Sequence, residues 1–286
     1  IRNLLAADYS GELHVVHQTA DAIEGILPVR TVGSLPRDVD VALVSVPASG
    51  VLSVVEELAG IGCGAAVVPS VGMNRADLDR LAGLARASGM AIHGPNCMGV
   101  VNVADHIPLW FYEGMLTDLR PGRVAIVSQS GSASMFVARS TDGVGFSRIV
   151  STGSEACLTS TDYLSWLADD SSTDAVVCIL ESIQNLDSFT SAVRRLREAR
   201  KRLFVLRVGR THVGAAASVA HTGALIGSDD AYRAYFASID VPLLRDYDEL
   251  AAVIQCASVV DLPTVPGTRL GIITISGGQA ALAADL

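Results

Sequence analysis

Short apolar runs alternate with longer amphipathic segments along almost the whole chain, and few folds accommodate that order. The apolar runs are rich in β-branched residues and occupy 12–17, 41–46, 65–69, 124–128, 175–181, 202–208 and 270–276. Between them, apolar side chains recur at three-to-four spacing in 49–60, 74–88, 131–140, 187–200 and 247–258. Continuous apolar strands are typical of a parallel sheet with helices on both faces. The pattern therefore predicts a doubly wound α/β fold.

Pro-Gly pairs divide the chain into three parts. TDLRPG (117–122) and LPTVPG (262–267) each precede a fresh apolar run, which is a usual linker signal. We expect a first domain at 1–118, a second at 119–261, and the opening of a third α/β domain at 262–286. Because the chain begins at Ile1 rather than Met, we also expect the first domain to lack its first strand.

Composition excludes several classes of function. The net charge is −9, which argues against a nucleic-acid partner. Lys201 is the only lysine in the sequence, so a Walker-type GxxxxGK[ST] loop is excluded. The five cysteines form no CxxC pair, and we predict no metal site. Charges interrupt every long apolar stretch, so we expect no membrane span and a cytoplasmic location.

A serine-rich turn follows the apolar run at 124–128. Ser130, Gly131 and Ser132 stand where a buried strand would open into a helix, and free backbone N–H groups at a helix N-terminus attract anions. This segment is interpreted as a phosphate-binding turn. The alternative is a plain serine N-cap with no ligand.

A second candidate is the segment 209–227, which combines four glycines with mostly small side chains. His221 lies within it, and a neutral imidazole nitrogen can attack a phosphoryl group. The alternative is a structural histidine, and that reading is kept for the other five histidines.

Five motifs occur in a characteristic order. They are GPNCMG (94–99), VSQSG (127–131), ILES (179–182), AHTGALIGSDD (220–230) and TISGG (274–278). In order and spacing the chain resembles the NDP-forming acyl-CoA synthetases, which are related to the succinyl-CoA synthetase α subunit. The resemblance implies a Rossmann-like CoA-binding domain followed by a flavodoxin-like, succinyl-CoA synthetase-like domain. It also implies an ADP-forming acid–CoA ligase that works through an acyl phosphate and a phosphohistidine.

The resemblance further implies roles for individual residues. His221 would carry the phosphate and Glu181 would orient its imidazole. Two helix ends would hold the phosphate, one at Ser130, Gly131 and Ser132 and the other at Gly277 and Gly278. The CoA site would include Val46, Pro47, Ser70, Gly72 and Asn96, with Asn96 fixing the loop beneath the site.

The same resemblance implies the partners. These are coenzyme A, a small carboxylic acid, and ATP or ADP with Mg²⁺ on an ATP-grasp domain or β subunit, in an oligomeric enzyme. The family's CoA-site lysine would fall near Thr19, so that contact would be lost or replaced.

Two alternatives stay open at this point. One is an inactive CoA-binding regulatory module, like the synthetase-like regions of protein acetyltransferases, although such regions often lack the histidine. The other is an NAD-binding oxidoreductase, for which a GxGxxG motif followed by an acidic residue is missing from the sequence.

Overall fold

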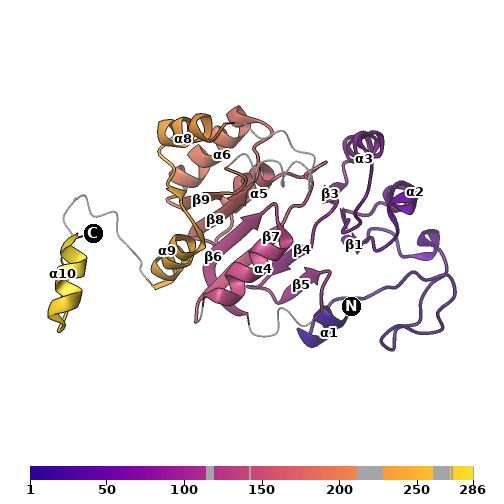
Figure 1. Cartoon of the computed structure of the whole chain (residues 1–286). Helices are drawn as coiled ribbons and strands as arrows, with labels where there is room; N and C mark the ends of the chain where they lie inside the picture. The colour runs from indigo at the N-terminus through magenta and orange to yellow at the C-terminus, as the bar shows by residue number, and fades with distance from the viewer. Residues whose placement is uncertain (114–118, 142, 211–227, 260–270, 272, 286) are drawn as a thin grey trace.

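The computed structural model describes residues 1–113, 119–141, 143–210, 228–259, 271 and 273–285. Within them the chain forms two sheets with helices packed around them (Figure 1). The predicted α/β architecture is confirmed.

The first sheet has three parallel strands in the order β1-β2-β3. Its strands are β1 (Val41–Leu43), β2 (Ala65–Val67) and β3 (Ala91–His93), joined by α2 (Ala48–Gly60) and α3 (Arg75–Ser88). Helix α1 (Arg2–Ala6) and the 3₁₀ turn η1 (Val32–Ser34) precede β1. Asn74 caps α3 by accepting a hydrogen bond from the Asp77 N–H, and Gly89, with φ of 73°, ends that helix.

The expected strand at 12–17 is not formed. Val16 makes only an isolated bridge with Val29, and most of the surrounding residues are exposed. Apolar composition alone does not make a strand where no continuous neighbour is available for pairing.

The second sheet has seven strands in the order β10-β9-β8-β6-β7-β4-β5. Its parallel part consists of β6 (Arg120–Ser128), β7 (Gly145–Ser151), β8 (Ala175–Leu180), β9 (Arg202–Arg207) and β10 (Leu243–Leu244). The hairpin of β4 (Gly99–Asn102) and β5 (Ile107–Trp110) adds to it antiparallel through β7. The sheet is therefore mixed at one edge, which the sequence pattern did not predict.

Helices cover both faces of this sheet, as Figure 1 shows. The helices are α4 (Gly131–Ser140), α5 (Ser160–Leu167), α6 (Leu186–Glu198), α8 (Asp229–Ser238) and α9 (Tyr247–Val259). Alternate residues of β6 belong to different cores: Val124 and Ile126 pack with residues of α4 and α9, whereas Ala125 and Val127 pack with α5 and α6. This two-sided burial explains why the strand sequence is apolar without interruption.

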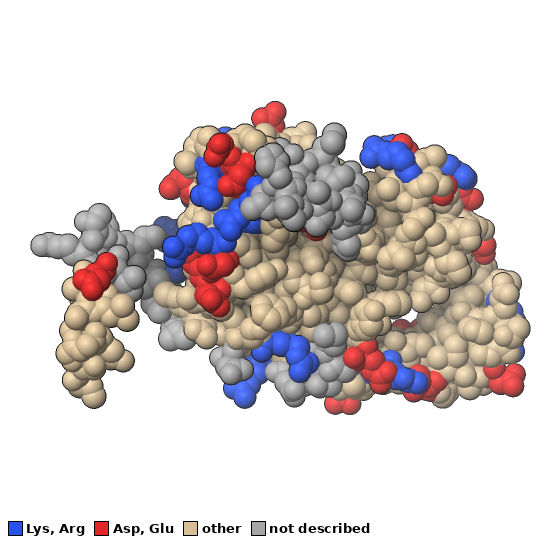
Figure 2. All heavy atoms as spheres, in the orientation of Figure 1, with Lys and Arg blue, Asp and Glu red and all other residues tan. Residues whose placement is uncertain are grey.

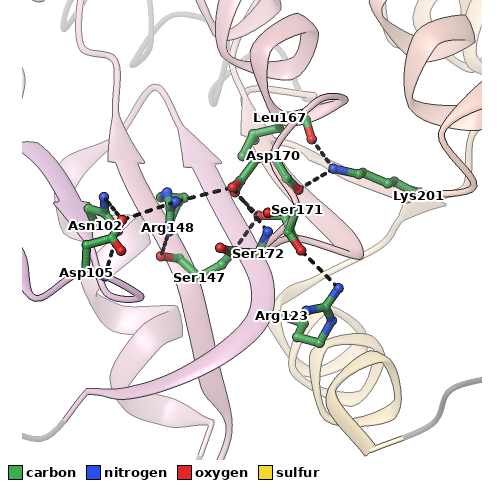
Figure 3. A network of polar contacts seen from close by, with 11 residues as sticks. Asn102, Asp105, Arg123, Ser147, Arg148, Leu167, Asp170, Ser171, Ser172 and Lys201 are labelled. Carbon is green, nitrogen blue, oxygen red and sulfur yellow. Dashed lines mark hydrogen bonds and ion pairs between the residues drawn. The ribbon is translucent and has the colours of Figure 1, made fainter.

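A buried polar network lies near the amino ends of β8 and β9 (Figure 3). The Arg148 guanidinium donates to Asp170 over 3.3 Å and lies 5.6 Å from the Trp166 ring centroid. Lys201 Nζ donates to the carbonyls of Leu167 and Asp170 over 2.6 and 2.5 Å. The single lysine therefore stabilises the end of α5, at the edge of the sheet opposite to the carboxyl ends of the strands.

The last described helix is α10 (Gly277–Asp285), none of whose residues is buried. The described residues before it do not form the expected strand at 270–276, and Ile273 and Ile275 are fully exposed. No described strand pairs with them, and an unpaired segment has no ladder to stabilise an extended conformation.

Candidate functional site

One buried side chain, Gln129, links the turn after β6 to the residues that follow β8. Its Oε1 accepts hydrogen bonds from the backbone N–H groups of Glu181, over 2.6 Å, and Ser182, over 3.1 Å. Its Nε2 donates to the Ser182 carbonyl over 2.8 Å. The amide therefore fixes the position of Glu181 relative to the serine turn that follows β6.

The serine turn itself is well ordered by hydrogen bonds. Ser128 Oγ accepts from the Ser130 N–H over 3.0 Å and donates to the Ser130 carbonyl over 2.7 Å. Ser130 is the N-cap of α4 and its Oγ accepts from the Ala133 N–H. Ser130 Oγ and Ser132 Oγ are 3.2 Å apart. The expected helix opening after the apolar strand is confirmed, whereas phosphate binding there stays a prediction.

Gly131 begins α4 beneath this turn. A Cβ at this position would lie 2.0 Å from Met98 Cγ and 3.0 Å from Ser151 Oγ. Only glycine fits here without displacing Met98, so the GPNCMG loop and the serine turn pack directly against each other.

Glu181 follows β8 immediately and is 7% exposed. In the next strand, Arg207 is fully buried: its Nη1 donates to Asp229 over 2.9 Å, and its guanidinium lies 4.3 Å from the Tyr232 ring centroid. The Val208 N–H donates to the Leu180 carbonyl over 2.9 Å. The chain therefore leaves β9 beside Glu181.

His221 lies outside the described residues, within 211–227. The described chain on either side is anchored near Glu181. Arg207 joins the end of β9 to Asp229, the first residue of α8, and Arg210 donates to the Arg245 carbonyl over 2.6 Å. The described residues on both sides of the segment that contains His221 therefore lie at the carboxyl edge of the sheet.

The predicted CoA residues gather at the carboxyl edge of the first sheet. Ser70 Oγ donates to the Val46 carbonyl over 2.6 Å, and the Asn96 N–H donates to the Ser70 carbonyl over 3.1 Å. Pro47 is the N-cap residue of α2. Gly72 has φ of 86° and open space where a Cβ would stand. The structure brings these five residues together, and their contact with CoA stays a prediction.

The two sheets meet through the GPNCMG loop. The Ser154 N–H donates to the Pro95 carbonyl over 2.9 Å, and a Cβ on Gly153 would lie 2.3 Å from that oxygen. Across the same junction, His93 Nδ1 lies 2.6 Å from Tyr163 Oη. Burial lowers the pKa of His93 to about 4, so this histidine is neutral near pH 7.

A second buried carboxyl group supports the loop after β7. Glu155 Oε1 accepts from Thr152 Oγ1 and from the Ser160 N–H, both over 2.8 Å. Burial raises the pKa of this carboxyl group. The motifs assign no role to the side chains of Glu155 and Gln129. The partners of Gln129 lie 52 and 53 residues away along the chain, so a local pattern does not reveal them.

The turn before α10 repeats the pattern of the turn before α4. The Ser276 N–H donates to Thr274 Oγ1 over 3.1 Å, and the Gln279 N–H donates to Ser276 Oγ over 3.3 Å. Ser130 is related in the same way to Ser128 and Ala133. Gly277 therefore corresponds in place to Gly131, and a phosphate role for Gly277 and Gly278 stays a prediction.

Among the described residues, no group of three or more His, Cys, Asp or Glu side chains has the geometry of a metal site. Similarly, no helix in the described part of the chain is long and apolar enough to cross a membrane.

Two family models match the chain, one in its N-terminal part and one in its C-terminal part. Residues 1–103 match a CoA binding domain, and residues 121–257 match the succinyl-CoA ligase like flavodoxin domain. The α subunit of acetate–CoA ligase [ADP-forming] I from Pyrococcus furiosus is 31% identical over 299 aligned residues, covering 100% of this chain and 63% of that protein. The chain belongs to the ADP-forming acyl-CoA synthetase family.

Other members of the family are equally similar. Trans-feruloyl-CoA synthase from an unknown prokaryote is 32% identical, covering 100% of this chain and 42% of that protein. The structure of the Candidatus Korarchaeum cryptofilum dinucleotide forming acetyl-coenzyme A synthetase 1, in complex with phosphate and ADP, superposes with a TM-score of 0.91 at 30% identity, covering 99% of this chain and 62% of that one. The predicted fold, a CoA-binding domain followed by a succinyl-CoA ligase-like flavodoxin domain, is confirmed.

The chain spans less than two thirds of the length of each of these relatives. The β4-β5 hairpin, which lies in the predicted first domain, pairs with the sheet of the second. The boundaries at 1–118, 119–261 and 262–286 stay predictions.

Proposed function

We propose that this chain is the CoA-ligating and phosphate-relay part of an ADP-forming acyl-CoA synthetase. The observation that carries the proposal is the arrangement around Gln129, which ties Glu181 to the serine turn at the N-terminus of α4. A helix N-terminus with free N–H groups beside a buried carboxylate suits a phosphate that is passed to a histidine.

The proposed reaction has three steps. A phosphate oxygen attacks the thioester carbonyl carbon of acyl-CoA, the C–S bond breaks, and the thiolate leaves with a proton as free CoA. An imidazole nitrogen of His221 then attacks phosphorus, the P–O bond to the acyl group breaks, and the carboxylate leaves. Finally the phosphoryl group passes from His221 to ADP, which gives ATP and the free imidazole.

In this reaction the residues of this chain bind the phosphate and CoA and orient the His221 imidazole. Ser130, Gly131 and Ser132 hold the phosphate at α4, and Gly277 and Gly278 supply the corresponding turn before α10. Glu181 is a positioning residue that fixes the imidazole tautomer and stabilises its positive form. Val46, Pro47, Ser70, Gly72 and Asn96 shape the CoA site at the edge of the first sheet.

ATP or ADP with Mg²⁺ is assigned to an ATP-grasp domain or subunit. Support comes from Pyrococcus furiosus relatives that are named as α subunits and from the lack of a Walker-type lysine in this sequence. We further propose an oligomeric enzyme in the cytoplasm. The relatives' names extend from acetate to trans-feruloyl-CoA, so family membership alone does not fix the acid.

The test is ATP formation from acyl-CoA, phosphate and ADP by the complete enzyme with its ATP-grasp part. We expect ATP and free thiol in equal amounts, and a loss of at least about a hundredfold in kcat for Glu181→Gln. The exposed Glu198→Gln on α6 is the matched control and keeps the wild-type rate. CoA binding without ATP formation from any acyl-CoA would contradict the proposal and favour a regulatory CoA-binding module.

A further inference from the structure

A groove runs along one side of α4, starting at the serine turn. Its volume is about 470 Å³, which is within the range of small-molecule sites. The walls are Met98, Trp110, Tyr112, Gly131, Ser132, Met135, Phe136, Arg139 and Ser140. Apart from Met98 in GPNCMG and Gly131 with Ser132 in the serine turn, none of these residues was singled out in the sequence.

The helix residues of the groove form a continuous face. Gly131, Met135 and Arg139 are spaced by four, as are Ser132, Phe136 and Ser140, so both rows lie on the same side of α4. From its first to its last residue α4 is roughly 13 Å long. The groove is therefore elongated, with the proposed phosphate site at one end and Arg139 with Ser140 at the other.

The walls are largely apolar and aromatic. Figure 2 shows mostly uncharged surface in the middle of this face, with acidic and basic side chains towards its rim. Phe136 is 56% exposed and Tyr112 is 52% exposed, so two aromatic rings of the groove are accessible. Large accessible rings that flank a concave surface are a feature of ligand-binding sites.

Trp110 places a buried indole N–H in the wall of the groove. The residue is 3% exposed, and its Nε1 has no hydrogen-bond partner among the described residues. A buried N–H without an acceptor is costly, and an oxygen atom of a bound ligand would remove that cost. At the far end, a guanidinium such as that of Arg139 interacts favourably with the face of an aromatic ring.

We propose that this groove binds the acyl chain of the substrate and selects monocarboxylic acids with an aryl or similarly bulky apolar side chain. The inference rests on the proposed function, since it places the acyl phosphate at Gly131 and Ser132 and lets its side chain extend along α4. A two-carbon acid leaves most of the groove unfilled and contacts neither Phe136 nor Tyr112. An aryl group buries apolar surface against both.

The test compares phenylacetate with acetate in the complete enzyme, measured as acyl-CoA formed from acid, CoA and ATP. We expect kcat/KM to be at least about tenfold higher for phenylacetate. Ser140→Phe adds a ring at the far end of the groove, and it lowers the phenylacetate-to-acetate ratio of kcat/KM by at least about tenfold. Ser191→Phe makes the same change on an exposed position of α6 and leaves that ratio unchanged. Equal thermal midpoints of the two variants show that both are folded.

Three outcomes overturn the inference. One is turnover of acetate with little or none of phenylacetate, which leaves the proposed function intact. Another is an equal loss for both acids in a folded Ser140→Phe protein, as expected if the ATP-grasp part covers the groove. The third is a change of the ratio in Ser191→Phe as large as in Ser140→Phe. Failure to activate any acid would instead count against the proposed function itself.

Discussion

Gln129 holds the site together at the scale of single residues. Its amide oxygen accepts hydrogen bonds from the backbone N–H groups of residues 181 and 182, and its amide nitrogen donates to the carbonyl of residue 182. Gln129→Leu keeps the size but leaves buried N–H groups without an acceptor, so we expect the free energy of unfolding to fall by roughly 3 kcal/mol. Urea denaturation measures this.

The matched control is Gln255→Leu, at an exposed position of α9. We expect it to change the free energy of unfolding by less than about 0.5 kcal/mol. If the two variants were equally stable, Gln129 would not organise the carboxyl edge of the sheet.

The sequence predicted the serine turn and the strand end at Glu181 because each is a local pattern. It did not predict that Gln129 joins them, since the two partners are 52 residues apart. Hydrogen bonds of this kind depend on strand order, and the order β9-β8-β6-β7 is not contained in any one segment.

At the scale of elements, α4 depends on the glycine at its first position. Gly131→Ala would place a Cβ 2.0 Å from Met98 Cγ, so we expect a loss of about 1–3 kcal/mol in the free energy of unfolding. The α4 N-terminus would move with Met98, and kcat for acyl-CoA formation would fall. Chemical denaturation and steady-state kinetics measure both effects.

Gly83→Ala is expected to change the free energy of unfolding in the opposite direction. Gly83 lies within α3 and has no atom within 4 Å of an added Cβ, so alanine there is expected to stabilise the protein by about 0.5–1 kcal/mol. A stabilising Gly131→Ala would show that Met98 and α4 are not in close contact.

Element prediction from periodicity succeeded where both faces of a strand are buried, as in β6 and β8. It missed β7, which carries Arg148 among apolar residues, and it missed the short hairpin strands β4 and β5. It wrongly predicted a strand at 12–17, where Val16 makes only an isolated bridge, and the described residues within 270–276 form no strand. Strand formation depends on neighbours as much as on composition.

At the scale of the whole molecule, the junction of the two sheets contains a buried histidine. His93 on β3 lies 2.6 Å from the Tyr163 hydroxyl on α5, and burial lowers its pKa from 6.5 to about 4. Between these pH values the unfolded chain binds more protons than the folded one, so the free energy of unfolding falls as pH falls. Above pH 6.5 the His93 imidazole is neutral in both states and its burial costs no stability. As the pH falls, the resulting loss in the free energy of unfolding approaches roughly 3 kcal/mol near pH 4.

Urea denaturation between pH 7.5 and 4.5 measures the effect. His93→Gln removes the titrating group and is expected to reduce the pH dependence, whereas the exposed His14→Gln keeps it. An unchanged pH dependence in His93→Gln would exclude His93 as the group responsible.

In the proposed reaction His221 carries the phosphate beside Glu181, and phosphorylation of the complete enzyme by γ-labelled ATP detects that intermediate. Digestion and peptide mapping locate the label, and His212→Ala is the control within the same segment. We predict an acid-labile, base-stable label on His221, close to one per active site, abolished in His221→Ala and retained in His212→Ala. A label that persists in His221→Ala, or maps to another residue, would contradict the account.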